Sequence, residues 1–238
     1  MKYFWLSFKA VLTKDLVAEF RSRQVLPTML VLGMLIIWVF RIASEAVSVN
    51  MPVMGTTALW VAFLFAGLLA QERSFSSEVH QDCMDALLLA PVDEGTIYLA
   101  KLFVNIIMLT VFELMIVPGV MIAFEITVSG GSLGSLITVL MLGNIGISSI
   151  GTLFAAIVQL SHTRGSLLSI LVLTILMPMM IPATLALLIL FGAVPAELVG
   201  TGALAFVGDL RSAIGYMVAF DAVFVVACWL LFGFAIKE

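Results

Sequence analysis

Charged side chains are scarce in this chain, and that scarcity excludes an ordinary soluble protein. Asp, Glu, Lys and Arg make up 11% of its 238 residues, whereas soluble domains carry about 25%. Hydrophobic residues reach 63%, and the mean hydropathy is +1.22. One soluble core of this size cannot bury so much apolar surface, so a bilayer must solvate the rest. We therefore predict an integral membrane protein.

Cysteine, histidine and enzyme signatures are equally sparse. Cys83 and Cys228 form no metal-spaced pattern, and His80 and His162 stand alone in polar segments, so unpaired thiols and solvated imidazoles are favoured. There is no P-loop, HExxH or GxSxG motif. The stretch SGGSLG at 129–134 lacks a following lysine and is typical of a turn. We expect no catalytic residue, no metal, no cofactor bound by this chain, no nucleic-acid partner and no cleaved signal peptide.

Long apolar runs are what the chain has in abundance. A bilayer core of about 30 Å needs about 20 mostly apolar residues per helix, and a helix satisfies every backbone polar group internally. Six runs are long enough, namely 25–44, 51–71, 97–124, 133–160, 166–192 and 213–236. The predicted fold is an all-α membrane protein with six transmembrane helices in a single domain, residues 1–238.

The distribution of Lys and Arg orients these spans. Six spans place both termini on one side, and cytoplasmic termini leave only Arg41 and Arg211, of 11 Lys and Arg in all, on the outer side. Cytoplasmic segments normally hold the excess of Lys and Arg. We therefore predict that both termini are cytoplasmic and that 72–96 is a cytoplasmic segment between the second and third spans.

The first 23 residues repeat large apolar side chains at helical spacing. An apolar face of this kind, with cations such as Lys2 and Lys9 on other faces, is typical of an amphipathic helix in the membrane interface. A loosely ordered tail is the alternative. The residues of the predicted apolar face are Trp5, Phe8, Leu12, Leu16 and Phe20.

Four polar residues of the predicted spans are candidates for a translocation path or a helix contact. They are Asn105 and Glu113 in the third span, Asn144 in the fourth and Asp221 in the sixth. Ionisable groups in a bilayer are costly unless they face partners or water. Two interpretations are open for Glu113, a polar point on a translocation path or a helix–helix contact; for Asp221 the contact is favoured. Small residues around Asn144 favour close helix packing.

The charged stretch ERSFSSEVHQDCMDALLLAP at 72–91 stands out between apolar runs. Apolar residues recur every four positions in it, and its acidic bias argues against lipid headgroups, which attract Lys and Arg. We predict a cytoplasmic coupling helix that docks on a soluble partner; a solvated loop helix is the alternative. The candidate docking residues are Glu72, Arg73, Phe75, Glu78, Val79, Asp82, Cys83, Asp85, Leu87, Leu88 and Leu89.

The same region carries a resemblance to a known family. The order ER-x-F, LLLAPVDEGTIYLAK, then Asn105 and Glu113 ahead of Pro118 resembles the CcmB family of haem-exporter permeases, related to ABC-2 type permeases. GTLFAAIVQLSHTRGSLLSILVLTILMPMMIP resembles the fourth and fifth spans of that family. The resemblance covers about residues 1–190. Where the family usually has glycine, a small residue, leucine and glutamate, this chain has Asp82, Cys83, Met84 and Asp85.

The resemblance implies a function and a set of partners. A CcmB-like permease of the bacterial inner membrane would couple ATP hydrolysis by a separate CcmA-like subunit, which binds ATP and Mg, to cytochrome c maturation. Its membrane partners would be CcmC-like and CcmD-like subunits, with a CcmE-like haem chaperone downstream. Haem would be the substrate or would leave on the released chaperone. The residues alone leave open a proton-coupled carrier that uses Glu113 and Asp221, or an assembly scaffold without transport.

Overall fold

The computed structural model describes residues 2–22, 24–47, 50–79, 94–128, 130–160, 166–194 and 209–235. Within these ranges the regular structure is entirely helical. The elements are α1 (Lys2–Ser22), α2 (Val25–Val47), α3 (Met51–Val79), α5 (Glu94–Ala123), the short 3-10 helix η1 (Gly130–Ser132), α6 (Leu133–Leu160), α7 (Ser166–Leu190) and α8 (Leu210–Ala235). The all-α prediction is confirmed.

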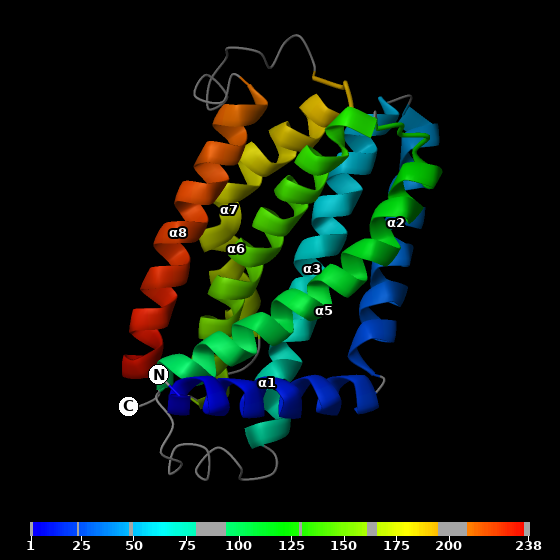
Figure 1. The fold of residues 1–238 in the computed structure, drawn as a ribbon. Coiled ribbons are helices and arrows are strands. Elements are labelled where there is room, and N and C mark those ends of the chain that lie inside the picture. The colour runs from blue at the N-terminus through cyan, green and yellow to red at the C-terminus, as the bar shows by residue number, and fades with distance from the viewer. Residues whose placement is uncertain are drawn as a thin grey trace.

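Six of these helices are long and apolar enough to cross a bilayer. The spans are Val25–Ala46, Met51–Glu72, Glu94–Ala123, Gly130–Val158, Ile170–Leu190 and Leu210–Phe234. They run alternately up and down, so the ends of α3, α6 and α8 lie at the same end of the bundle as the starts of α2, α5 and α7 (Figure 1). The protein is therefore a multi-pass membrane protein, as the six apolar runs predicted.

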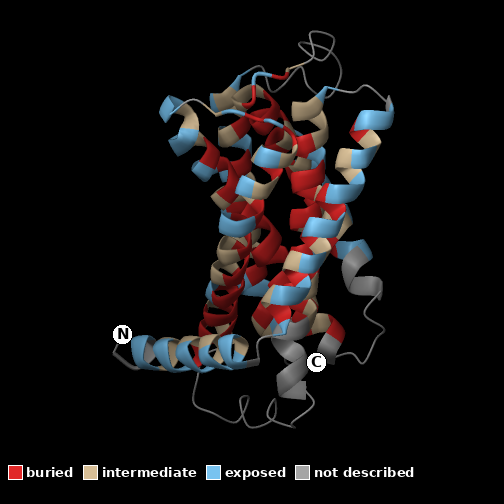
Figure 2. Ribbon diagram, turned by 90° about the vertical axis from the view of Figure 1, so that its right-hand side faces the viewer, coloured by how far each residue is buried: buried red, intermediate tan, exposed pale blue. Residues whose placement is uncertain are grey.

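Helix α6 lies at the centre of the bundle and packs against α3, α5, α7 and α8. Figure 2 shows buried residues gathered along the inner helices and exposed ones along the outer faces. Large apolar side chains such as Val31, Trp38 and Val223 are exposed, which suits contact with lipid. Apolar burial between helices gains little in lipid, because acyl chains are as apolar as leucine. Small and polar residues therefore decide which faces meet.

One close approach involves Gly151 of α6 and Gln71 of α3. The Gln71 amide donates a 2.9 Å hydrogen bond to the carbonyl of Ile147. A Cβ atom at Gly151 would overlap the Gln71 amide group. Glycine is therefore required at this position for Gln71 to reach the α6 backbone.

Helix α1 lies across one end of the bundle, roughly perpendicular to the spans (Figure 1). It packs on the first half of α5; Val11 is buried, and the rings of Phe8 and Phe103 meet edge to face at 5.6 Å. Trp5 and Phe20 are exposed. The predicted helix is confirmed, and the insertion of its apolar face into lipid stays a prediction.

The start of α8 is capped by Asp209. Its Oδ1 atom accepts a 3.0 Å hydrogen bond from the backbone N–H of Ser212 and another from the Ser212 hydroxyl. Such a cap satisfies a backbone N–H that has no partner in the first helical turn. The hydrogen bonds from Ser212 hold the pKa of Asp209 below its ordinary value of 3.8.

The first prediction concerns this cap. Because the folded pKa of Asp209 is lowered, its stabilisation is present above the ordinary pKa of 3.8 and is lost as the pH falls through the lower folded value. Asp209→Asn keeps an acceptor that does not titrate in this range. Melting temperature measured in detergent from pH 6 to pH 2 should therefore fall less in Asp209→Asn than in the wild type. Parallel curves would contradict the assignment.

The second prediction concerns Gly151. Gly151→Ala should displace Gln71 and destabilise the protein by about 1–3 kcal/mol, as overpacking usually does. The matched control is Gly215→Ala in α8, where an added Cβ meets nothing within 4 Å. Thermal unfolding of the purified chain should show a loss for Gly151→Ala and none for the control. Equal melting temperatures would refute the close approach.

Candidate functional site

The predicted docking segment begins inside a helix that also crosses the membrane. Helix α3 runs from Met51 to Val79 without a break, although its membrane span ends at Glu72. Five candidate docking residues, Glu72, Arg73, Phe75, Glu78 and Val79, therefore lie on a prolongation of the second span. The other candidates, from Asp82 to Leu89, lie outside the described residues, as do His80 and His162.

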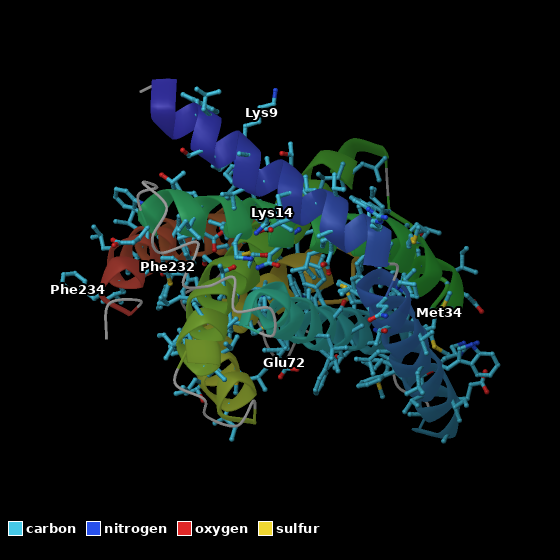
Figure 3. The ribbon with its side chains drawn as sticks, turned by 90° about the horizontal axis from the view of Figure 1, so that it is seen from below. Lys9, Lys14, Met34, Glu72, Phe232 and Phe234 are labelled. Carbon is cyan, nitrogen blue, oxygen red and sulfur yellow. The ribbon has the colours of Figure 1, made fainter. Side chains whose placement is uncertain are left out.

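This prolongation emerges at the end of the bundle that carries α1. Figure 3 looks onto that end and shows Glu72 at the foot of the bundle, with Lys9 pointing away from it and Lys14 on the opposite side of α1. The described cations of α1 are Lys2, Lys9, Lys14 and Arg21. Arg41 lies near the end of α2 and Arg211 at the start of α8, both toward the end of the bundle opposite α1. Arg41 pairs there with Glu45 at 3.3 Å.

A buried ion pair fastens α1 to α5. The Nζ atom of Lys101 lies 3.2 Å from Oδ2 of Asp15, and Lys101 is only 1% exposed. Lys14 lies 3.2 Å from the other oxygen of Asp15. By sequence alone, Lys101 is only one of the Lys and Arg residues predicted on the cytoplasmic side. A lysine seven residues into an apolar helix was the available signal, since such a lysine needs an acidic partner.

A row of hydrogen bonds joins the first half of α5 to α6. The Tyr98 hydroxyl donates to the carbonyl of Ser149 at 3.1 Å. The Asn105 amide donates to the Thr152 hydroxyl at 2.8 Å, and that hydroxyl donates to the carbonyl of Ser148. The structure thus places Asn105 in a helix–helix contact.

Asn144 continues this row toward the opposite end of the bundle. Its amide donates to the carbonyl of Ile106 at 3.1 Å and to the hydroxyl of Thr110 at 3.0 Å. Its oxygen accepts a 3.1 Å bond from the Ser148 hydroxyl. The side chain of Asn144 lies beside the carboxyl group of Glu113. The glycines on either side of Asn144 face other helices: Gly143 faces Trp60 of α3, and Gly146 faces Met179 of α7.

Glu113 and Asp221 are the two buried acids whose oxygens are left without partners. Each is 6% exposed, and within the described residues Oε1 of Glu113 and both carboxylate oxygens of Asp221 have no hydrogen-bond partner. Asp221 faces Gly146, where an added Cβ would lie 2.8 Å from its Oδ1. Asn144 and Gly146 are about 200° apart around α6. The two acids therefore lie on opposite sides of α6 and do not share a site.

The described residues contain no cluster of three or more His, Cys, Asp or Glu that could hold a metal ion. Cys228 is a buried free thiol beside Tyr98, and Cys83 lies outside the described ranges. The described residues show three structural features instead. Helix α3 extends beyond its membrane span, α1 is held across the same end of the bundle by an ion pair to α5, and a row of hydrogen bonds joins α5 to α6.

Comparison with known proteins adds one match. A family model described as CcmB protein matches residues 6–223, nearly the whole chain. No curated protein matches the sequence.

The third prediction tests the ion pair. Asp15→Leu should leave the Lys101 ammonium buried without its carboxylate and cost on the order of 3 kcal/mol. The double variant Asp15→Leu with Lys101→Met removes both charges and should recover most of that loss. Thermal unfolding of the two purified variants measures the difference. A double variant no more stable than Asp15→Leu would show that the pair does not fasten α1 to α5.

Proposed function

Because the chain belongs to the CcmB family, we propose that it couples ATP hydrolysis by a separate subunit to haem delivery for cytochrome c maturation. The family is that of the permease subunit of an ABC-type haem exporter, so the chain itself is not the ATPase. The match over residues 6–223 carries the proposal. Six membrane spans and the lack of a P-loop in the sequence support it.

The proposed complex contains a soluble CcmA-like subunit that binds ATP and Mg, CcmC-like and CcmD-like membrane subunits, and a CcmE-like haem chaperone as client. The permease transmits the energy of ATP hydrolysis either to haem translocation or to release of the haem-loaded chaperone. Haem is the substrate of the system in both versions.

The proposed contact with the ATPase is the segment from Glu72 to Leu89. Helix α3 supports this choice, because its prolongation to Val79 is continuous with the second span. A push on that prolongation would move the span as one rod, and α3 packs directly on α2, α5 and α6. Closure of the ATPase would thereby change how the central helices pack.

We place this end of the bundle, with both termini, in the cytoplasm of a bacterium and the spans in its inner membrane. The cations of α1 support that orientation under the positive-inside rule. A proton-coupled carrier would need Glu113 and Asp221 on a common path. Their positions on opposite sides of α6 do not favour that function, and no observation favours a scaffold without transport.

The fourth prediction tests the docking segment. Phe75→Asp and Leu87→Asp each put a charge on the apolar stripe of the docking segment, which consists of Phe75, Val79, Cys83 and Leu87 and is proposed to meet the ATPase. Each variant should reduce co-purification of the ATPase at least tenfold, a loss of about 1.4 kcal/mol or more. The amount of ATPase recovered per permease is measured after affinity purification from detergent-solubilised membranes.

Leu133→Asp is the matched control, because Leu133 is an exposed leucine at the start of α6, at the opposite end of the bundle. It should leave ATPase recovery unchanged. All variants should keep the melting temperature of the wild-type spans. Full recovery of the ATPase with both stripe variants would contradict the proposed contact, and a wild-type chain that recruits no ATPase would contradict the proposed function.

A further inference from the structure

Helices α3 and α6 fit together at glycines that alternate between the two helices. They run in the same direction and pack against each other (Figure 1). A Cβ atom added at Gly143 of α6 would lie 2.6 Å from the ring of Trp60, and one added at Gly67 of α3 would lie 2.7 Å from Cγ2 of Ile147. At both levels a large side chain of one helix therefore lies against a glycine of the other.

Gln71 forms a third level and adds a hydrogen bond to it. The side chain is fully buried, and its amide nitrogen donates to the carbonyl of Ile147 at 2.9 Å. Gly151 leaves room for the amide group, because a Cβ atom there would overlap it. Oε1 of Gln71 has no partner within the described residues, so the bond to α6 is the hydrogen bond that the side chain makes there.

This fit permits one register between the two helices. The residues one turn away from Gly151 on α6 are Ile147 and Ala155, and each carries the Cβ atom for which Gln71 leaves no room. A slide by one turn, about 5.4 Å, would also take Ile147 away from Gly67. Small residues and interhelical hydrogen bonds are what hold helices together in lipid. An axial displacement of α3 must therefore take α6 along or break the Gln71 bond.

Gln71 lies where a displacement from the docking segment would enter the spans. It directly precedes Glu72, at which the membrane span of α3 ends, and α3 continues without a break to Val79. Helix α6 packs against α5, α7 and α8 as well as against α3. A displacement that passes from α3 to α6 thus reaches three further spans.

We propose that Gln71 is the positioning residue that carries an axial displacement of α3 to α6, so that the two helices move as one unit when the ATPase closes. This inference rests on the proposed function, because it takes the ATPase as the source of the displacement. The glycines bring the helices close, and the hydrogen bond to Ile147 fixes their register. The change in packing then occurs at contacts other than the one between α3 and α6.

The fifth prediction uses Gln71→Met, which keeps a similar length and removes the donor. The variant should still recruit the ATPase, because the segment from Glu72 to Leu89 is intact. The haem transferred to apocytochrome c per ATP hydrolysed should fall about threefold or more, the factor that corresponds to an interhelical hydrogen bond in a membrane. This coupling ratio is measured in membrane vesicles that contain the complete maturation system.

Thr57→Val is the matched control in the same helix, because Thr57 is exposed and its hydroxyl bonds to Val53 of α3 itself. It should leave the coupling ratio unchanged. An equal ratio in Gln71→Met and the wild type would overturn the assignment of Gln71.

A double variant separates the hydrogen bond from packing. Gly151→Ala with Gln71→Ala removes the overlap without restoring the bond. Its melting temperature should exceed that of Gly151→Ala alone, while its coupling ratio should stay as low as that of Gln71→Met. A ratio that recovers together with the melting temperature would show that packing carries the displacement, and would overturn the role of the bond.

A disulfide offers a replacement for the bond. Cγ2 of Ile147, which would lie 2.7 Å from a Cβ at position 67, is bonded to Cβ, and disulfides join Cβ atoms about 3.5–4.5 Å apart. The variant is Gly67→Cys with Ile147→Cys, in a chain that carries Cys83→Ser and Cys228→Ser. The disulfide should form to the same extent with and without ATP. Added to Gln71→Met, it should raise the coupling ratio on oxidation, and a reductant should reverse the gain.

Three outcomes of the disulfide experiment would contradict the proposal. A yield that changes with ATP, or a loss of activity on oxidation when Gln71 is present, would show that α3 slides along α6. A disulfide that leaves Gln71→Met uncoupled would show that holding this register does not transmit the displacement.

The wild-type coupling ratio keeps the two proposals distinguishable. A wild-type complex without ATP-driven haem transfer overturns the proposed function, and this inference with it. A coupled wild type whose ratio survives Gln71→Met overturns the role of Gln71 alone.

Discussion

The hydrocarbon core of a bilayer offers no water to replace a missing hydrogen bond, and the arrangement of this bundle follows from that constraint. Side chains from two neighbouring helices, Gln71 of α3 and Tyr98 and Asn105 of α5, all direct their hydrogen bonds to α6. Asn144 of α6 returns bonds to α5. Apolar packing alone would let these helices slide, whereas each bond is made in one register only.

A different interaction holds α1, which lies across one end of the bundle (Figure 1). Val11 and Phe8 give α1 an apolar contact with α5, and the Asp15–Lys101 pair adds a charged contact that lipid cannot replace. Because this pair joins α1 to α5, the two helices are expected to move together. Helix α5 is also the span that follows the proposed docking segment. Helix α1 is thus fixed to α5 by both an apolar and a charged contact.

Among the buried polar atoms that lack a hydrogen-bond partner within the described residues, those of Glu113 and Asp221 are the ones on ionisable side chains. Most of the buried polar side chains of α6 bond to neighbouring helices or to their own helix, while these two acids keep unpartnered oxygens on opposite sides of α6. An unsatisfied carboxyl costs free energy in the isolated chain, and that cost is removed when a donor arrives.

The amino-acid sequence by itself determined the six spans and the presence of a helix in the first 22 residues, because both depend on local hydrophobic length and spacing. It also carried the family resemblance, in motifs such as LLLAPVDEGTIYLAK. Tertiary structure alone decided the partner of Lys101, which lies 86 residues away in sequence, and the reason for glycine at 151. Only the fold could separate Glu113 from Asp221, because hydropathy assigns each acid the same cost wherever its neighbours lie. Which side of α6 a carboxyl faces depends on how the helices pack.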